Sequence, residues 1–480
     1  MKTSITGKPI PTVEGSLQTF SADPVACMQK LQQEHGDLVA LREGDQDVVF
    51  AFGADYNRRV LSRPDDFHSR FFAIRGPKRS AQRRLSSGLL SMNGDEHSQQ
   101  RRILQAAFQK RAIPGYASMI EHHTQEMLDR WKPGRAFDLN EEMIQLLLRI
   151  SSSMLFGMSD PKLALEIGGM MDEWVRLNHE LGAAAFESPD EFYPQYQHLL
   201  QYSEQLEERI REMISQVENG PLDGDDVLSL LIRAKRMGAP LTDEQLIGQA
   251  AIVFGAAHLT TSHTLTWTLL LLAQHPEVMR QLDAEFGSTP KAIVQARPDS
   301  TPNGLARKES SLLDRVIHES MRILPASAYS QRVSQRDLRL GRFFLPANSI
   351  VVFSQFMTHR NEWIFPESKR FSPDRWLDLS PSAYEYLPFG GGPRLCIGAA
   401  LATSILRTVL PMTLRKFRIG VQPHAKVDAL VVSTMLTPVS GLPVTVWTGG
   451  DVAETAPIRG NLNSLVDLPE LQQIELARAA

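Results

Sequence analysis

The feature that most constrains the fold is a long apolar segment between Thr242 and Ala273. Thr242 and Gln245 have the spacing of a capping box, which marks the start of a helix, and Pro276 ends the helical pattern. At about 1.5 Å per residue this helix is roughly 45 Å long. Polar residues such as His258 interrupt the apolar run, so burial inside protein explains it better than a lipid bilayer does. We therefore expect the chain to fold around this helix, and we expect no transmembrane span.

Helical periodicity also dominates the rest of the sequence, and strand-like runs are short. The expected strands are Asp37–Arg42, Asp47–Phe52, Leu338–Phe344, Ser349–Phe353 and Val444–Trp447. The predicted fold class is mainly α with a minor β portion. We expect one domain over 1–450 and a C-terminal tail of unknown role over 451–480. The Gly/Ser/Pro-rich stretch Gly287–Gly304 is expected to be a surface loop within that domain.

The composition is that of an ordinary globular protein, with 42% hydrophobic and 22% charged residues. The net charge of -4 gives no general reason to expect nucleic acid or an anionic membrane as a partner. Residues 1–30 contain no apolar run long enough for a signal peptide or membrane anchor, so we expect a cytoplasmic protein. Cys27 and Cys396 are the only cysteines, which excludes a disulfide framework and leaves room for one special thiol.

The glycine-rich segment Phe389–Gly398 carries the clearest chemical signal. Its glycines allow the backbone to approach a bulky group closely. Cys396 lies just before the predicted helix Ala399–Phe417, where the unpaired N–H groups and the helix dipole favour a thiolate over a thiol. A thiolate is the state that a metal ligand needs. A phosphate-binding loop is a poor alternative, because no Lys-Ser/Thr pair follows the glycines.

This segment resembles the haem-binding signature F-x-x-G-x-R-x-C-x-G of the cytochrome P450 family. Every fixed position matches, namely Phe389, Gly392, Arg394, Cys396 and Gly398. The resemblance covers nearly the whole chain apart from both tails, and it implies the P450 fold with the long helix over a buried haem b. It further implies that Cys396 is the axial iron ligand, that Phe389 shields the thiolate and that Arg394 pairs with a haem propionate. Thiolate donation to iron favours O–O bond cleavage.

Three further side chains resemble propionate-binding residues of the family. His97 and Arg101 match its H-x-x-x-R helix, and Arg332 occupies a position where the family places an arginine. Without this context the pair at 97 and 101 reads as a solvated helix face. The two propionate carboxylates of a buried haem require such charge-assisted hydrogen-bond partners.

Glu319 and Arg322 lie three residues apart on a predicted helix, upstream of Arg375. Alone, such a pair is usually exposed and contributes little. Together the three resemble the Glu-Arg-Arg triad of the P450 family, which implies a structural role in the haem-side core.

The segment from Ala256 to Ser262 of the long helix resembles the family's oxygen-activation pattern A-G-x-[D/E]-T-[T/S], with Thr260 as its threonine. Two positions depart from the pattern. Ala257 replaces a glycine, which should narrow the helix groove over the haem, and Leu259 replaces an acid that takes part in proton delivery. We therefore expect an oxygenase with an altered water path. The alternatives left open are a peroxygenase or isomerase-type haem-thiolate enzyme, and outside enzymes a haem-binding sensor or carrier.

The resemblance implies a monooxygenase that receives electrons from separate redox proteins, because no reductase is fused to this chain. Arg102, Lys110 and Arg111 could form the docking face for an acidic ferredoxin or flavodoxin. A second basic group could hold an acidic substrate or a carrier protein, although most charge runs are merely solvated; it comprises Arg75, Lys78, Arg79, Arg83 and Arg84.

By family analogy, substrate contacts come from four segments, Phe71–Leu90, Phe254–Thr260, Leu324–Ser330 and Thr434–Pro438. Their apolar or weakly polar character predicts a lipid, terpenoid or polyketide-like substrate.

Overall fold

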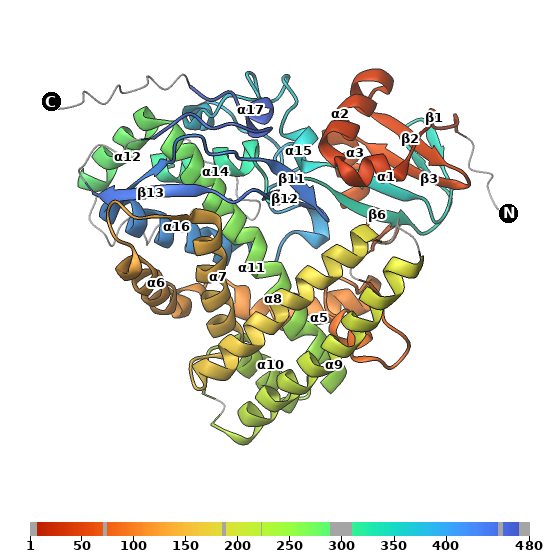
Figure 1. Cartoon of the computed structure of the whole chain (residues 1–480). Coiled ribbons are helices and arrows are strands. Elements are labelled where there is room, and N and C mark those ends of the chain that lie inside the picture. The colour runs from red at the N-terminus through yellow and green to blue at the C-terminus, as the bar shows by residue number, and fades with distance from the viewer. Residues whose placement is uncertain are drawn as a thin grey trace.

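The computed structural model describes residues 7–70, 74–184, 189–221, 223–288, 310–449 and 455–469. A large helical body lies beside a smaller region that contains the N-terminal strands β1 to β3 and the later strand β6 (Figure 1). The helices are α1 (Leu17–Ala22), α2 (Pro24–His35), α3 (Ala54–Leu61), α4 (Ala81–Leu85), α5 (Gly94–Phe108), α6 (Ile113–Arg130), α7 (Leu139–Phe156), α8 (Pro161–Ala184), α9 (Pro189–Asn219), α10 (Val227–Arg236), α11 (Asp243–Gln274), α12 (Pro276–Ser288), α14 (Leu312–Ile323), α15 (Gln355–Thr358), α16 (Ala399–Lys416) and α17 (Leu462–Leu465), with short 3-10 helices η1 (Pro373–Leu377) and η2 (Gly392–Arg394).

Strands gather in one larger sheet and three small ones. Their bounds are β1 (Thr12–Glu14), β2 (Leu38–Glu43), β3 (Gln46–Ala51), β4 (Phe67–Ser69), β5 (Ala136–Asp138), β6 (Ser330–Ser334), β7 (Leu338–Leu340), β8 (Phe343–Leu345), β9 (Ile350–Phe353), β10 (Phe417–Val421), β11 (Ala429–Val432), β12 (Met435–Pro438) and β13 (Pro443–Thr448). The larger sheet has the order β1-β2-β3-β9-β6-β4, while β10-β13-β5, β11-β12 and β7-β8 form the small sheets. Parallel pairing of β3 with β9 joins the N-terminal region to the segment that carries Arg332.

Four of the five expected strands are confirmed, with bounds that differ by a residue or so, as β2, β3, β9 and β13. The fifth expectation, a single strand over Leu338–Phe344, is wrong. This run contains two strands, β7 and β8, which pair antiparallel with Leu340 opposite Phe343. Gly341 has a φ of 67°, which is the left-handed conformation that such a tight turn requires. The expected loop Gly287–Gly304 falls mostly outside the described residues, and Gly287 itself lies in α12.

The long apolar segment forms α11, and the predicted capping box of Thr242 and Gln245 is present. α11 packs along α7 and passes through the middle of the helical body (Figure 1). Several of its threonines bond within the helix; for example, the hydroxyls of Thr264 and Thr268 donate to backbone carbonyls four residues earlier. This explains how an interrupted apolar run can lie buried. No helix among the described residues is long and apolar enough to cross a membrane.

The C-terminal tail is described only over 455–469, and this stretch packs against the rest of the protein. Ile458, Leu462 and Leu465 are buried in the main hydrophobic core. Thr455 also bonds to the sheet region, because its hydroxyl accepts a hydrogen bond from the backbone N–H of Val421 at 3.2 Å. The described part of the tail is therefore continuous with the core of the domain.

Candidate active site

A cavity of about 430 Å³ lies between α11 and the loop that carries Cys396. Its wall is assembled from segments far apart in sequence, including α5, α7, α8, α11, β6 and the stretch that leads into α16. Most of the lining residues are apolar, such as Leu104, Met154, Val175 and Leu401. The predicted place for a buried site, along the long helix, is therefore where the cavity lies.

Backbone hydrogen bonds within the loop fix the conformation of the segment that carries Cys396. The N–H of Cys396 donates to the carbonyl of Phe389 at 2.9 Å, and the N–H of Leu395 donates to the carbonyl of Gly392 at 3.0 Å. Gly392 has a φ of 66°, and a Cβ at this position would lie 2.1 Å from the carbonyl oxygen of Leu61. Only glycine therefore allows the loop to turn this close to α3, which explains this fixed position of the motif.

Cys396 lines the cavity, and its side chain is accessible from the cavity space. Burial raises the pKa of the Cys396 thiol, and the backbone N–H of Gly398 and the charge of Arg101 offset only part of this rise. The N–H groups at the helix start therefore lower the pKa of the thiol as expected, but desolvation outweighs them while no metal is bound. A metal ion supplies the missing stabilisation, since coordination deprotonates a thiol.

The side chains expected to bind propionates meet at one place in the cavity wall. His97 and Arg101 come from α5, Arg332 from β6 and Arg394 from η2. We call these four residues the cationic cluster. Burial first, and then the charges of the three arginines, lower the pKa of His97 to about 4. Burial and neighbouring positive charge also lower the pKa of Arg332 to about 10 and that of Arg394 to about 10.

The guanidinium groups of the cationic cluster bond only to neutral acceptors among the described residues, with no carboxylate in an ion pair. These hydrogen bonds run from Arg101 Nη2 to the Leu395 carbonyl (2.6 Å), from Arg394 Nη2 to Asn93 Oδ1 (2.7 Å) and from Arg332 Nη1 to the Gln331 carbonyl (2.8 Å). Arg394 Nη2 also donates to the Met92 carbonyl. Buried cations without a counter-charge are destabilising. The cluster is therefore complete only when an anionic ligand is present.

These two features fit haem b. Cys396 offers a sulfur donor on one side of the cavity, and the cationic cluster offers donors for two carboxylates at its edge. The cavity between them is lined mainly by carbon, as a porphyrin ring requires. Sequence motifs alone could not show that these groups converge.

The α11 face over the cavity contains Ala256, Ala257 and Thr260, as the oxygen-activation pattern predicts. The hydroxyl of Thr260 donates to the Ala256 carbonyl at 2.7 Å and lies partly exposed. Leu259 is half-buried and does not line the cavity. His258 points away from it as well, because its ring nitrogens contact the Ile144 carbonyl and the Asp172 carboxylate on neighbouring helices.

Glu319, Arg322 and Arg375, which we call the Glu319 cluster, form a closed buried network. Glu319 receives hydrogen bonds from Arg322 at 2.8 Å and from Arg375 at 2.9 Å. Burial raises the pKa of Glu319, but the two arginines and the backbone N–H of Ser372 lower it more, so the carboxylate stays ionised. Arg322 also donates to the carbonyls of His359 and Ser368. None of the three lines the cavity, which supports the expected scaffold role.

All four segments expected to touch substrate contribute to the cavity wall. They do so through Leu89 and Leu90, through Gly255 to Ala257 with Thr260, through Ala326, Ser327 and Ser330, and through Thr434 and Met435. Residues 71–73 of the first segment lie outside the described residues. In the second basic group, none of the five residues lines the cavity, and Arg84 is paired with the buried Glu207 at 2.7 Å. For Arg84 an acidic substrate is therefore not the partner.

Sequence reasoning missed the walls that α7 and α8 supply, which include Ile150, Met154, Trp174 and His179. It also missed Asn93, whose Oδ1 accepts from Arg394. No fixed motif marks these positions. Only the helical periodicity of α7 and α8 hinted that one face is buried.

Comparison with known proteins agrees with this geometry. The cytochrome P450 family model matches residues 6–441. Cyclooctat-9-en-7-ol 5-monooxygenase of Streptomyces melanosporofaciens is 28% identical over 81% of this chain and 84% of its own length. Pentalenene oxygenase of Streptomyces avermitilis is 27% identical over 84% and 89%.

Among solved structures, the retinoic-acid-bound cyanobacterial CYP120A1 superposes with a TM-score of 0.76 at 20% identity, over 92% of this chain and 100% of that one. This likeness confirms the predicted fold. The cysteine signature, the convergent cationic cluster and the match along most of the sequence lead to one conclusion: the chain belongs to the cytochrome P450 family of haem-thiolate enzymes and is a monooxygenase.

Proposed function

We propose that this enzyme inserts one oxygen atom from O2 into an apolar, terpenoid-type small molecule, with electrons from separate redox proteins. The observation that carries the proposal is the apolar cavity of about 430 Å³ between Cys396 and the Thr260 face of α11. Two relatives are named for oxidation of cyclooctat-9-en-7-ol and pentalenene. Their identity to this chain supports a substrate of the same chemical class.

The cavity wall supports a hydrocarbon substrate. The described lining residues include no aspartate, glutamate or lysine, and their charged side chains belong to the cationic cluster. Outside that cluster, the polar side chains of the lining are neutral or weakly basic, among them Ser327, Thr434 and His179. Apolar walls with a few placed polar groups favour a carbon skeleton with at most one or two oxygens.

Each predicted site residue has a place in this proposal. Cys396 binds the haem iron, with its loop fixed by Phe389, Gly392 and Gly398. The cationic cluster holds the propionates. When bound, haem b with a thiolate ligand supplies the activation of O2 and the oxygen transfer. The protein then contributes orientation, exclusion of water and a proton path.

Thr260 is the residue of α11 best placed to hold a proton near the reacting centre, because its hydroxyl lines the cavity. Leu259 offers no carboxylate, and its side chain does not line the cavity. Protons therefore travel through the Thr260 hydroxyl, cavity water and polar groups of the substrate. Ala257 narrows the helix surface at the same place.

Electron donors approach the side of the protein where α5 ends. Arg102 is exposed on α5, the helix that also carries Arg101, and Lys110 and Arg111 are exposed just beyond its end. An acidic ferredoxin or flavodoxin with its reductase is the complementary partner. Turnover supported by such a donor should fall as the salt concentration rises, whereas turnover with added peroxide should not.

The decisive test is Cys396→Ala. The reduced CO adduct of the wild type should show the strongly red-shifted Soret band of thiolate ligation, and the variant should lack it. A variant that keeps the band would show that another residue binds iron.

Substrate class is tested with a panel of cyclic terpenes, fatty acids and aromatic polyketides. Terpenes should produce the largest substrate-induced Soret shifts, and the product should carry one oxygen atom from labelled O2 when a ferredoxin system supplies electrons. Turnover with peroxide alone, and none with redox partners, would instead establish the peroxygenase alternative.

A further inference from the structure

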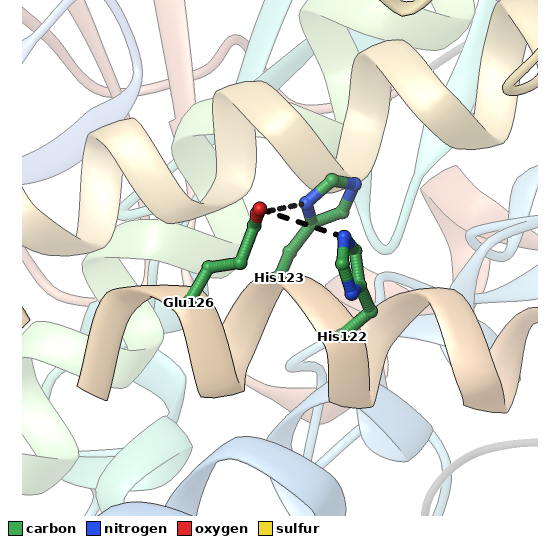
Figure 2. Close-up of side chains that lie close together, drawn as sticks. All are labelled: His122, His123 and Glu126. Carbon is green, nitrogen blue, oxygen red and sulfur yellow. Dashed lines mark hydrogen bonds and ion pairs between the residues drawn. The ribbon is translucent and has the colours of Figure 1, made fainter. Parts of the chain in front are cut away.

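Three side chains that can bind a metal lie together on α6, outside the active-site cavity (Figure 2). His122, His123 and Glu126 each offer one ligand atom, and these atoms lie within 4.8 Å of one another. Spacings of i, i+4 and i, i+3 place both histidines beside Glu126 on the helix. Figure 2 shows both imidazole rings directed at the Glu126 carboxylate.

The distances already approach those of a metal site. His123 Nδ1 lies 3.1 Å from Glu126 Oε2, and His122 Nε2 lies 3.5 Å from Glu126 Oε1. Tetrahedral Zn²⁺ with ligands at about 2.0–2.1 Å places neighbouring ligand atoms about 3.3 Å apart. The His122 side chain is 56% exposed, so it can turn toward the other two without disturbing the core.

His123 has the kind of outer partner that metal-binding histidines use. It is buried, and its Nε2 lies 2.9 Å from the Ser153 hydroxyl of α7. A hydroxyl can donate to Nε2 or accept from it, so Ser153 holds the ring in either tautomer. When Nε2 donates to Ser153, the lone pair of Nδ1 faces Glu126. Such contacts orient the ligand and raise metal affinity.

The charges around the site suit a divalent ion of moderate affinity. His123 Nδ1 and a carboxylate oxygen of Glu126 lie at hydrogen-bond distance, so one potential ligand atom of each residue already faces the other. A metal ion would replace the proton that the two now share. Arg149 adds positive charge nearby and opposes a cation. Three ligands and this opposing charge indicate weaker binding than at a closed four-ligand site.

We propose that His122, His123 and Glu126 form a binding site for a late first-row divalent metal ion such as Zn²⁺. Two imidazoles and one carboxylate are typical of this class, and water completes the coordination because His122 and Glu126 are exposed. The site links α6 to α7 through Ser153. The bound ion stabilises the folded state by mass action, by about 3 °C in midpoint temperature when free Zn²⁺ exceeds the dissociation constant a hundredfold.

The experiment uses the haem-loaded enzyme, freed of other metals with a chelator and dialysed against ZnCl2. Zinc bound per chain is measured by elemental analysis, and unfolding is followed by heating. The exposed ligands are changed in His122→Ala and Glu126→Gln. His35→Ala is the matched control, because His35 is a partly exposed histidine 3.7 Å from Glu34 that belongs to no cluster of three ligands among the described residues.

Wild type and His35→Ala should bind one saturable Zn²⁺ per chain and gain thermal stability. His122→Ala and Glu126→Gln should bind it at least tenfold more weakly, with the Soret band of the CO adduct unchanged in all four. An anomalous scattering peak between the three side chains in zinc-soaked crystals would locate the ion. Equal zinc affinity in wild type and Glu126→Gln, or binding that never saturates, would overturn the proposal.

Discussion

The Glu319 cluster and the cationic cluster are both buried and both contain arginine, yet their charges are balanced in opposite ways. Glu319 accepts hydrogen bonds from Arg322 and Arg375, and backbone carbonyls accept the remaining donors of Arg322. In the cationic cluster, no described carboxylate pairs with Arg332 or Arg394. A network that is complete within the chain belongs to the scaffold, whereas one that lacks its counter-charge marks the place of a ligand.

The largest expected effect is on the Glu319 cluster. Glu319→Ala leaves two buried cations uncompensated and should cost about 3–5 kcal/mol of unfolding free energy, with little holoprotein recovered. The matched control is Glu277→Ala, which removes an exposed i, i+3 pair with Arg280 and should cost little. Denaturant unfolding of both variants measures the difference. Equal stability would show that the Glu319 cluster is not the scaffold that its geometry indicates.

The second effect is a pH dependence that separates apoprotein from holoprotein. Because the folded-state pKa of His97 is about 4, below its usual 6.5, the unfolded chain takes up a proton first as pH falls. The unfolding free energy that neutral His97 contributes is thus present in full above pH 6.5. It is lost as the pH falls toward 4, by about 3 kcal/mol at most.

The measurement is the unfolding free energy of wild type minus that of His97→Gln, between pH 7 and pH 4, with and without haem. Propionates beside His97 favour its charged form, so the loss should shrink in the holoprotein. The same loss in both forms would place the anionic ligand elsewhere.

The third effect, that of Arg332→Leu, should differ between the apoprotein and the holoprotein. Arg332→Leu removes a buried cation that lies over the Phe353 ring and whose hydrogen-bond acceptor among the described residues is a backbone carbonyl. With no described counter-charge lost, the apoprotein should be as stable as wild type or about 1 kcal/mol more stable. The holoprotein should lose haem at least ten times faster. Apoprotein unfolding and haem transfer to a scavenger protein measure the two quantities. A destabilised apoprotein with normal haem retention would make Arg332 part of the scaffold.

The smallest effect is expected at Leu259, where the family pattern has an acidic residue and this chain has none. Leu259→Glu should raise product formed per NADPH about twofold for poor substrates and lower the hydrogen peroxide released, provided that the new carboxylate stays hydrated and ionised. Leu259→Gln is the control of similar shape without charge, and Thr260→Ala should lower coupling. If Gln improves coupling as much as Glu, or Thr260→Ala changes nothing, protons reach the centre by another route.

The sequence predicted much of the site because its motifs are local. The spacing within Phe389–Gly398 and the capping box at Thr242 act over one turn of chain, and the structure contains both. Local spacing failed where a second segment decides the outcome. The turn at Gly341 depends on the pairing of β7 with β8, which the residue pattern of Leu338–Phe344 does not show.

The sequence by itself determined the helical class, the long buried helix and the identity of the residues that carry the chemistry, because periodicity and motif spacing are properties of neighbouring residues. The tertiary structure alone decided that His97, Arg101, Arg332 and Arg394 meet with no carboxylate from the described residues, while Glu319 pairs with two arginines. It also decided that α7 and α8 close the cavity and that Ser153 reaches His123. Charge balance and cavity shape arise between segments distant in sequence, and only packing brings those segments together.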